Sequence, residues 1–260
     1  MPLINKKYNA REYLAYMGAK QLNDKKSVFV GTGLPIVSAM LAKKTCAPDL
    51  LIVLESGSIA PSLPELIISV GEYRTFYKAI MATSMHDIMS LSQSGYIDYG
   101  FLGAAQIDVY GNINTTVIGD HVMPKVRLPG SGGASDVASF STRLITIITN
   151  QSKRTFVDKL DFMTSPGYLD GLGSRERAGL PRETGPYRVV TQLGVYGFNK
   201  STKKMGLISL HPGVCIEEVQ ENSSFDITIP EHVNVSSEPT EYELQILRKD
   251  VDPAGIVLGK

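Results

Sequence analysis

The sequence has little of what marks secreted, disulfide-linked or membrane proteins. It contains only two cysteines, Cys46 and Cys215, and they are too far apart to form a CxxC pair. We therefore expect neither a disulfide framework nor a zinc site, and we expect both thiols to be reduced and packed near the core. No stretch approaches the roughly 20 apolar residues of a transmembrane helix, and the first residues have no signal-like apolar run. These absences predict a cytoplasmic protein without a membrane partner.

Net charge and the common catalytic signatures are absent as well. The 26 Lys and Arg residues balance 26 Asp and Glu residues, whereas a nucleic-acid partner requires a basic face. A local basic pocket for a small anionic cofactor stays open. The four histidines form no HxH or HExxH pattern, so no metal site is expected. No GxSxG, GxGxxG or P-loop sequence occurs, which removes support for a serine hydrolase or a common nucleotide-binding loop.

What the chain does have is enough apolar material for a large core, arranged in a regular alternation. It has 260 residues, of which 43% are hydrophobic. Short β-rich apolar runs alternate with segments of helical spacing, and Asn9 is the expected N-cap of the first helix. The expected strands are residues 27–31, 50–54, 73–77, 144–148, 189–191 and one within 95–103, and the expected helices are residues 10–22, 34–44, 84–94 and 240–249.

This alternation predicts the fold class. Short buried strands separated by helices are typical of an α/β fold with an open, mainly parallel sheet and flanking helices. Because there is no internal repeat and no low-complexity linker, we expect a single domain over residues 1–260, with its C-terminal helix at about 240–249. The Gly/Pro/Arg-rich stretch 165–186 is expected to be an ordered loop.

One acidic residue stands where α/β enzymes place their chemistry. Glu55 follows the apolar run 50–54 and precedes Ser56 and Gly57, so it is expected at the carboxyl end of a buried strand. A carboxylate there can attack an acyl carbonyl, form a mixed anhydride and then become an enzyme thioester. A glutamate needs no base for this, since it is ionised at neutral pH. From the residues alone, a structural glutamate that caps the turn remains the alternative.

Three segments of small residues also fall at expected strand ends. The segments at residues 31–33 (Gly-Thr-Gly) and 130–134 (Gly-Ser-Gly-Gly-Ala) lack a Cβ at most positions, so their backbone N–H groups can approach an anion or an acyl oxygen. The third, residues 103–108, contains Gln106, whose amide can meet a carbonyl or a pantetheine amide. Taken singly, each segment is equally compatible with an ordinary turn.

Together these segments resemble the B (β) subunit of family I CoA-transferases, specifically the glutaconate CoA-transferase group. The resemblance covers nearly the whole chain and rests on an ordered series of motifs. They are GTGLP at 31–35, ESG at 55–57, GAAQID at 103–108 with YGN at 110–112, GSGGA at 130–134, TSPG at 164–167 and GSRER at 173–177. The resemblance implies the open α/β sheet of the CoA-transferase and ribose-5-phosphate isomerase fold.

The resemblance also implies a reaction and a set of site residues. The reaction is ping-pong transfer of CoA from an acyl-CoA to a free carboxylic acid, for which a di- or oxo acid is expected. Coenzyme A is then a substrate, and no cofactor or metal is permanently bound. By the resemblance, Glu55 forms the glutamyl-CoA thioester. The residues implied to contact CoA or the oxyanion are Gly130, Ser131, Gly132, Gly133, Ala134, Gly103, Ala104 and Gln106, and the acyl-site loop is Gly31, Thr32 and Gly33.

A missing partner is the last implication of the resemblance. The B (β) subunit pairs with a homologous A (α) subunit, which completes a shared active site and supplies much of the acyl pocket, so this chain alone is expected to be inactive. Arg175, Arg177 and Arg182 lie in the 165–186 loop and are expected either to bind a CoA phosphate or to reach the interface. A solvated loop face is the alternative.

Two other functions stay open. Some relatives keep this fold and the CoA pocket but decarboxylate a CoA thioester or open a carbon ring by hydrolysis, and a scaffolding subunit without catalysis is a third reading. Retention of Glu55 and of both glycine loops favours transfer. The sequence does not identify the acyl-CoA donor, the acid acceptor or the oligomer size beyond one αβ pair.

Overall fold

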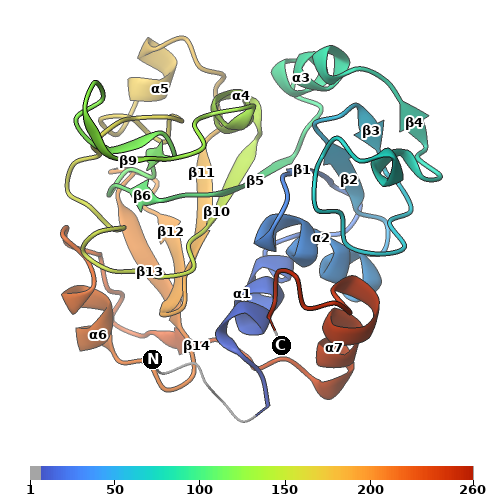
Figure 1. The fold of residues 1–260 in the computed structure, drawn as a ribbon. Coiled ribbons are helices and arrows are strands. Elements are labelled where there is room, and N and C mark those ends of the chain that lie inside the picture. The colour runs from blue at the N-terminus through green and yellow to red at the C-terminus, as the bar shows by residue number, and fades with distance from the viewer. Residues whose placement is uncertain (1–6, 260) are drawn as a thin grey trace.

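The computed structural model describes residues 7–259 and is built around one ten-stranded sheet (Figure 1). In spatial order the strands are β14 (Asn234–Val235), β13 (Met205–Leu210), β12 (Gly194–Phe198), β11 (Pro186–Val190), β10 (Arg143–Ile147), β5 (Tyr99–Gly103), β1 (Ser27–Val30), β2 (Leu51–Leu54), β3 (Ser58–Ile59) and β4 (Met81–Ala82). The five central strands, β2, β1, β5, β10 and β11, run parallel, and antiparallel strands extend the sheet on both sides. The predicted open α/β sheet is confirmed.

The helices and two small sheets complete the architecture. The helices are α1 (Ala10–Ala19), α2 (Leu34–Lys44), α3 (Met85–Gln93), α4 (Ala134–Phe140), α5 (Ser174–Arg177), α6 (Ile216–Glu221) and α7 (Glu241–Ile246), with a 3₁₀ turn η1 (Tyr73–Phe76) and a π turn η2 (Leu247–Val251). One small hairpin joins β6 (Gln106–Ile107) to β7 (Ile113–Asn114), and another joins β8 (Val117–Gly119) to β9 (Pro124–Arg127). Figure 1 shows α1, α2 and α7 together beside β1 and β2, while α4, α5 and α6 lie in the half that carries β10 to β13.

Alternating side chains of the central strands pack into different hydrophobic clusters on the two faces of the sheet. Val28 and Val30 of β1 pack into the cluster formed with α1, α2 and α7, whereas Phe29 packs into the cluster formed with α3 and α4. The same alternation places Ile52 and Val53 of β2 on opposite faces. Because successive side chains of a strand point to opposite faces, a continuous apolar run is the pattern that a doubly covered strand requires.

Three of the longer helical segments begin with a capping box, which satisfies backbone donors that a helix start would otherwise leave free. At α1, Oδ1 of Asn9 accepts from the N–H of Glu12 at 2.9 Å, and Oε2 of Glu12 accepts from the N–H of Asn9 at 2.8 Å. The expected N-cap role of Asn9 is confirmed. Ser84 begins α3 and Thr240 begins α7 in the same way. The expected C-terminal helix therefore exists, as α7 continued by η2.

Two expectations from the sequence are wrong, and a third needs a refinement. Residues 73–77 do not form a strand; residues 73–76 are η1, in which only Thr75 is buried and Tyr73 is 88% exposed, so the segment has no face to add to the sheet. Cys46 and Cys215 are free, but both are exposed rather than packed near the core. The 165–186 loop is ordered but contains the short helix α5. Between Lys7 and Gly259, no helix has both the length and the apolarity to cross a bilayer.

Candidate functional site

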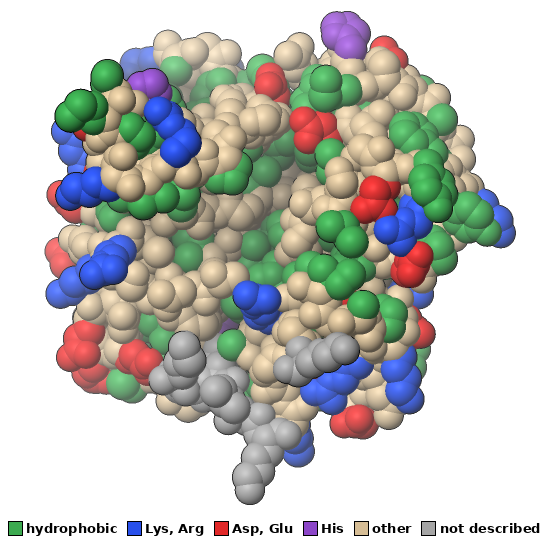
Figure 2. Space-filling view, viewed as in Figure 1, with side chains coloured by type: hydrophobic (Ala, Val, Ile, Leu, Met, Phe, Trp, Pro, Cys, Tyr) green, Lys and Arg blue, Asp and Glu red, His purple; other side chains and the backbone are tan. Residues whose placement is uncertain are grey.

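Parallel pairing brings three of the predicted segments to one edge of the sheet. Glu55 follows the last residue of β2, the Gly31 segment follows β1, and Gly103 ends β5. β1 lies between β2 and β5 in the sheet, with neighbouring strands about 4.8 Å apart. The carboxyl ends of these strands therefore form one continuous edge, where sites of open α/β sheets are found. Figure 2 shows the near face hollowed at its centre, between the half that carries β9 to β13 and the half that carries α1, α2 and β2.

The Glu55 carboxylate lies directly against the second glycine loop. A β-carbon at Gly133 would be 3.1 Å from Oε1 of Glu55 and 2.7 Å from the methyl carbon of Met89. Glycine is needed here for space, since the φ angle of Gly133 is an ordinary −78°. Glu55 is half-buried, and within residues 7–259 its carboxylate has no hydrogen-bond or ion-pair partner. A carboxylate that is partly desolvated and unpaired is available to react.

The glycine loop near this carboxylate holds three successive backbone donors without a partner. Among the described residues, the backbone N–H groups of Ser131, Gly132 and Gly133 have no hydrogen-bond partner. The neighbouring groups are used, because the N–H of Ala134 donates to the carbonyl of Ser131 at 2.9 Å and Oγ of Ser131 accepts from Ser135. Three successive free N–H groups beside a carboxylate can stabilise negative charge that develops on an acyl oxygen.

The segments at the ends of β1 and β5 line open space rather than packed turns. A β-carbon at Gly31 or Gly33 would meet nothing within 4 Å, and at Gly103 it would meet only the carbonyl of Ile147 at 3.9 Å. Gly33 has a φ of +81°, which favours glycine, and it begins α2 without a side-chain cap. Thr32 is exposed. This arrangement leaves room for a ligand along the edge from Glu55 to β5.

The structure places Gln106 in a different role from the one expected. Its side chain is 5% exposed, Nε2 donates to Asp161 at 2.9 Å, and Oε1 accepts from Nδ2 of Asn114 at 2.8 Å. The amide is therefore occupied by the protein and is not free to meet a ligand. The nearby Asp108 is also a scaffold residue: burial raises the pKa of its carboxyl, which accepts from Asn112. Ala104, beside Gly103, is half-buried.

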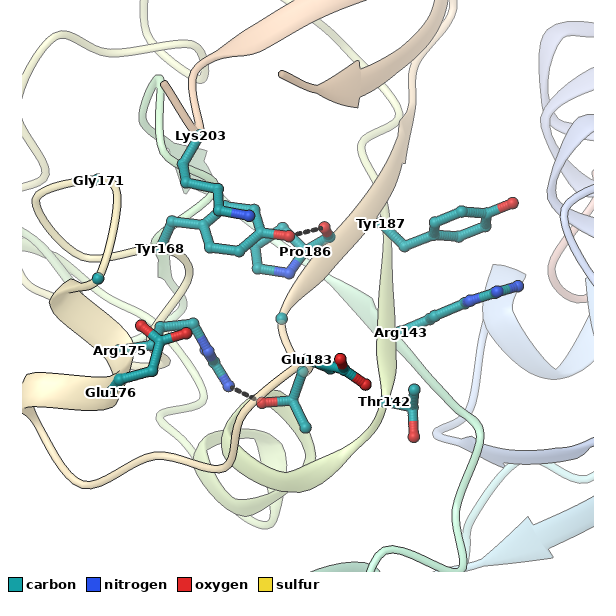
Figure 3. Close-up of a pocket in the computed structure, with 13 residues that line it drawn as sticks. Thr142, Arg143, Tyr168, Gly171, Arg175, Glu176, Glu183, Pro186, Tyr187 and Lys203 are labelled. Carbon is teal, nitrogen blue, oxygen red and sulfur yellow. Dashed lines mark hydrogen bonds between the residues drawn. The ribbon is translucent and has the colours of Figure 1, made fainter. Parts of the chain in front are cut away.

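Arg175 is also reassigned, from an anion-binding residue to a buried clamp (Figure 3). It is 2% exposed, and its guanidinium donates to the carbonyls of Gly167 and Ser139 at 2.7 and 2.8 Å and to Oγ1 of Thr184 at 2.9 Å. Burial lowers the pKa of the Arg175 guanidinium. The cavity that it borders, of about 250 Å³, lies near the amino ends of β10 and β11, at the opposite edge from Glu55. Arg177 and Arg182 are exposed, as the solvated-loop alternative expects.

A second cavity, of about 740 Å³, lies where β10 and β11 end and α1 begins. It offers space, but several of its polar side chains are already paired. Gln192 exchanges two hydrogen bonds with the backbone of Gln151, and Asn9 binds the carbonyl of Leu258. We assign no ligand to this cavity. In the part of the chain that the structure describes, no cluster of three or more His, Cys, Asp or Glu side chains is arranged to hold a metal ion.

Met89 is the site residue that the sequence did not indicate. It lies in α3, within the expected helix 84–94. Only the folded structure brings its methyl group and the Glu55 carboxylate together at Gly133, where an added β-carbon would meet both. An apolar group there limits the access of water to the carboxylate.

Comparison with known proteins agrees with this geometry. The family described as Coenzyme A transferase matches residues 11–222. The chain is 43% identical over 242 residues to the β (B) subunit of the 3-oxoadipate CoA-transferase of Pseudomonas knackmussii, a match that covers 93% of this chain and 92% of that one. It is 38% identical over 251 residues to the β (B) subunit of the glutaconate CoA-transferase of Acidaminococcus fermentans, which covers 95% and 93%.

A solved structure gives the same result. The crystal structure of glutaconate coenzyme A-transferase from Acidaminococcus fermentans superposes with a TM-score of 0.91 at 36% identity, covering 97% of this chain and 98% of that one. A more distant relative, 29% identical over 224 residues (86% of this chain, 83% of that one), is the cholesterol ring-cleaving hydrolase IpdB subunit of Rhodococcus jostii.

Proposed function

The chain belongs to the coenzyme A transferase family, and from this premise we propose that it is the β-type subunit that carries the covalent step of CoA transfer on Glu55. The observation that supports this role most directly is how near the loop lies to the carboxylate, since a β-carbon at Gly133 would be 3.1 Å from Oε1 of Glu55. A free nucleophile and three free N–H donors at the same point are what a reaction through two successive tetrahedral intermediates needs.

The first half-reaction loads CoA onto the enzyme. The Glu55 carboxylate attacks the thioester carbonyl of the donor acyl-CoA and forms a tetrahedral intermediate. The carbon–sulfur bond of this intermediate breaks, CoA departs as a thiolate, and an acyl-glutamyl anhydride remains. The thiolate then attacks the glutamyl carbonyl of that anhydride, which releases the donor acid as its carboxylate and leaves a glutamyl-CoA thioester. In each addition the carbonyl oxygen gains a negative charge, and each positioned N–H donor contributes about 3–4 kcal/mol to the transition state.

The second half-reaction repeats these steps in reverse with the acceptor. The carboxylate of the acceptor acid attacks the glutamyl-CoA carbonyl and expels the CoA thiolate, forming a new mixed anhydride. The thiolate attacks the acyl carbonyl that came from the acceptor, so the new acyl-CoA departs and Glu55 is regenerated as a carboxylate. No proton transfer to a general base is required, since every nucleophile in the cycle is already an anion.

The partner that completes the site is a homologous α (A) subunit, and the surface next to Glu55 is suited to receive it. Large apolar side chains are exposed along η1, β4 and the start of α3: Ile68, Tyr73, Tyr77, Ile80, Met81 and Met85. Figure 2 shows hydrophobic side chains gathered on the right flank, over β3 and β4. β4 is an edge strand of the ten-stranded sheet, and the hydroxyl of Ser56 contacts that of Thr75, so this surface continues directly from Glu55. An exposed apolar patch on a sheet edge is typical of a protein interface.

The substrates are an acyl-CoA and a free di- or oxo acid, in line with relatives named for 3-oxoadipate and glutaconate. CoA itself is a substrate rather than a bound cofactor. We take the cytoplasm as the compartment, since both cysteines are free and exposed and therefore suited to a reducing environment.

The test is to trap the covalent intermediate. The chain is reconstituted with its α partner and given succinyl-CoA or acetyl-CoA without an acceptor acid. Mass spectrometry of the peptide that carries Glu55 should show an increase equal to CoA less water, and adding the acceptor acid should remove it. No adduct with any acyl-CoA, or an adduct on another residue, would contradict the proposal. Ring cleavage or decarboxylation without an adduct would favour the lyase or hydrolase alternative.

A further inference from the structure

A hydroxyl behind the glycine loop holds the loop at its entry. Oγ1 of Thr115, which follows β7, donates to the carbonyl of Gly130 at 2.8 Å. The carbonyl of Thr115 accepts from the N–H of Gly130, also at 2.8 Å. Both backbone polar groups of Gly130 are therefore bound to the same residue. This pair sets where the loop leaves the hairpins and starts toward Glu55.

The bond to Gly130 also sets the direction of the first free donor. The carbonyl of Gly130 and the N–H of Ser131 belong to one planar peptide unit and point in opposite directions. While Thr115 holds the carbonyl, the N–H of Ser131 points away from Thr115, where it has no partner within residues 7–259. Glycine on the N-terminal side, with φ of +95°, imposes little restraint on this peptide, so the hydroxyl supplies the restraint.

Thr115 is fixed in turn by buried polar groups. Its N–H donates to Oγ1 of Thr164 at 2.8 Å, and that hydroxyl lies 3.4 Å from Oδ1 of Asn114. Asn114 has no solvent exposure and donates to Oε1 of Gln106. A network of paired, buried groups is rigid because breaking any member leaves an unsatisfied group out of water. Through this network, Gln106 supports the position of Thr115 without contacting the ligand.

The far end of the same segment is held by Arg175. The loop runs directly into α4, and the Arg175 guanidinium donates to the carbonyls of Ala138 and Ser139 in the last turn of that helix at 3.2 and 2.8 Å. A cation at a helix C-terminus is favoured by the helix dipole. The guanidinium also donates to Oγ1 of Thr184 at 2.9 Å. The segment 130–140 is thus anchored at both ends while its middle remains open at Glu55.

From these contacts we infer that Thr115 is a positioning residue for the transfer reaction: its hydroxyl keeps the Ser131 N–H directed at the oxyanion that forms on the acyl group at Glu55. The inference rests on the proposed function, because the direction of this donor affects catalysis only if acyl chemistry takes place at Glu55. Thr115 itself touches no substrate and acts only through the Gly130–Ser131 peptide.

Two adjacent threonines give a matched pair of variants. Thr115→Val removes the hydroxyl that binds Gly130. Thr116→Val is the control: Thr116 is half-buried like Thr115, and its hydroxyl contacts Thr164 at 2.7 Å rather than the loop. Without that hydroxyl, Thr164 still accepts from the N–H of Thr115 and still lies 3.4 Å from Oδ1 of Asn114, so the bond from Thr115 to Gly130 keeps its support. In the complex with the α partner and succinyl-CoA, we expect Thr115→Val to slow single-turnover adduct formation about tenfold and to change KM by less than about twofold, since ground-state binding is not altered. Thr115→Ser should restore the rate, and Thr116→Val should leave it near that of the unmodified complex.

A second measurement separates this inference from the proposed function. Hydrogen exchange in the peptide spanning residues 130–137 reports the loop directly, because Ala134 and Val137 donate to the carbonyls of Ser131 and Gly133. Exchange should be faster in Thr115→Val and unchanged in Thr116→Val. An unchanged adduct rate in Thr115→Val, or an equal loss in Thr116→Val, overturns the inference. If the unmodified complex forms no adduct with any donor, the proposed function fails, and the exchange comparison alone decides whether Thr115 holds the loop.

Discussion

The edge that carries Glu55 and the network behind the glycine loop differ in the hydrogen bonding of their polar groups, which lack protein partners at the edge and are paired in the network. At the edge, the Glu55 carboxylate and the N–H groups of residues 131–133 have no partner among residues 7–259. Behind the loop, Gln106 and Asn114 of the network and Arg175 at the end of α4 are each at most 5% exposed, and their polar atoms are paired except for Nε of Arg175. Both regions are rich in the motifs that relate this chain to its family.

The difference has an energetic cause. A polar group at an open edge can be solvated until a substrate replaces the water, so leaving it without a protein partner costs little. A buried polar group without a partner costs about 1–3 kcal/mol, so the network must be complete before the chain is stable. The pairing state of a polar group therefore separates a residue that binds substrate from one that holds the scaffold. Variants of the first kind should lose activity and keep stability. Variants of the second kind should lose stability, and they should lower activity only where the scaffold sets the direction of a donor, as at Thr115.

The largest effect is expected from Glu55→Asp. The shorter side chain withdraws the carboxylate from the reacting carbonyl, so transfer should fall by about 10⁴-fold while the unfolding midpoint stays unchanged, because no protein contact is lost. Slow hydrolysis of acyl-CoA is expected to persist, since a misplaced carboxylate can still direct water. Initial rates of transfer and of free CoA release measure both activities. Transfer near that of the unmodified enzyme would remove Glu55 from the covalent step.

Gly133→Ala should lower activity next most strongly. Its φ of −78° accepts alanine, but the added methyl group would lie 3.1 Å from Oε1 of Glu55 and 2.7 Å from the methyl carbon of Met89. Displacing the carboxylate or the loop by about 1 Å should reduce the rate of adduct formation about 100-fold. Stopped-flow measurement of CoA loading, with the unfolding midpoint as a control on folding, tests this.

A double variant identifies which neighbour is responsible for that loss. Met89→Ala removes the closer of the two contacts, so Met89→Ala with Gly133→Ala should recover part of the rate if crowding is the cause. A loss that is simply the product of the two single losses would mean that the Gly133 methyl group acts through Glu55 alone.

The sequence predicted well those features that depend on local pattern. The run 50–54 predicted the buried strand and hence the place of Glu55, and α2 begins and ends at the expected residues, 34 and 44. Parallel pairing then follows from the alternation of strands and helices. The expectation of a strand at residues 73–77 failed because aromatic residues, which favour strands, also occur on an exposed apolar surface, where Tyr73 and Tyr77 lie.

The hydrogen-bond partners of the polar groups could not be predicted from the sequence, because they are residues far apart in the chain. Gln106 donates a hydrogen bond to Asp161, which is 55 positions away. Arg175 donates to the carbonyls of Ser139 and Ala138 at the end of α4, which are 36 and 37 positions away. The motifs suggested ligand contact for Gln106 and a CoA phosphate or the interface for Arg175, whereas the hydrogen bonds of both side chains are made within the chain. Met89 carried no signal, because its contact with the loop arises only when α3 and α4 pack together.

The network side of the comparison predicts a stability effect. Arg175→Met removes the donors to the carbonyls of Ser139 and Gly167 and should lower the free energy of unfolding by about 3–4 kcal/mol, because several buried acceptors lose their partner. Arg177→Met is the control: Arg177 is exposed and should change stability by less than about 0.5 kcal/mol. Urea midpoints of the complex, at one protein concentration, measure both. Equal midpoints would show that the clamp does not stabilise the fold.

The smallest effect is a dependence of stability on pH through His211. This side chain is 1% exposed beside Thr191, Ser236 and the ring of Tyr13, and burial lowers the pKa of His211 from 6.5 to about 4. The folded chain therefore holds His211 in its neutral form. Above pH 6.5 the residue contributes its full stability, and between pH 6.5 and 4 the unfolded chain takes up a proton that the folded chain does not. Stability should fall over this window by about 3 kcal/mol at most.

A variant isolates this contribution from that of the carboxylates, which titrate in part of the same window. His211→Gln keeps an amide that can donate to the carbonyl of Thr191 but has no titrating group, so its stability should fall less steeply between pH 6.5 and 4 than that of the unmodified chain. Urea midpoints at half-unit steps of pH measure the two slopes. Transfer activity, measured at pH 7 and above, should be the same in both proteins, because His211 belongs to the scaffold and Glu55 to the open edge. Parallel slopes would mean that His211 already carries a proton in the folded chain, which the apolar surroundings and the single carbonyl acceptor do not support.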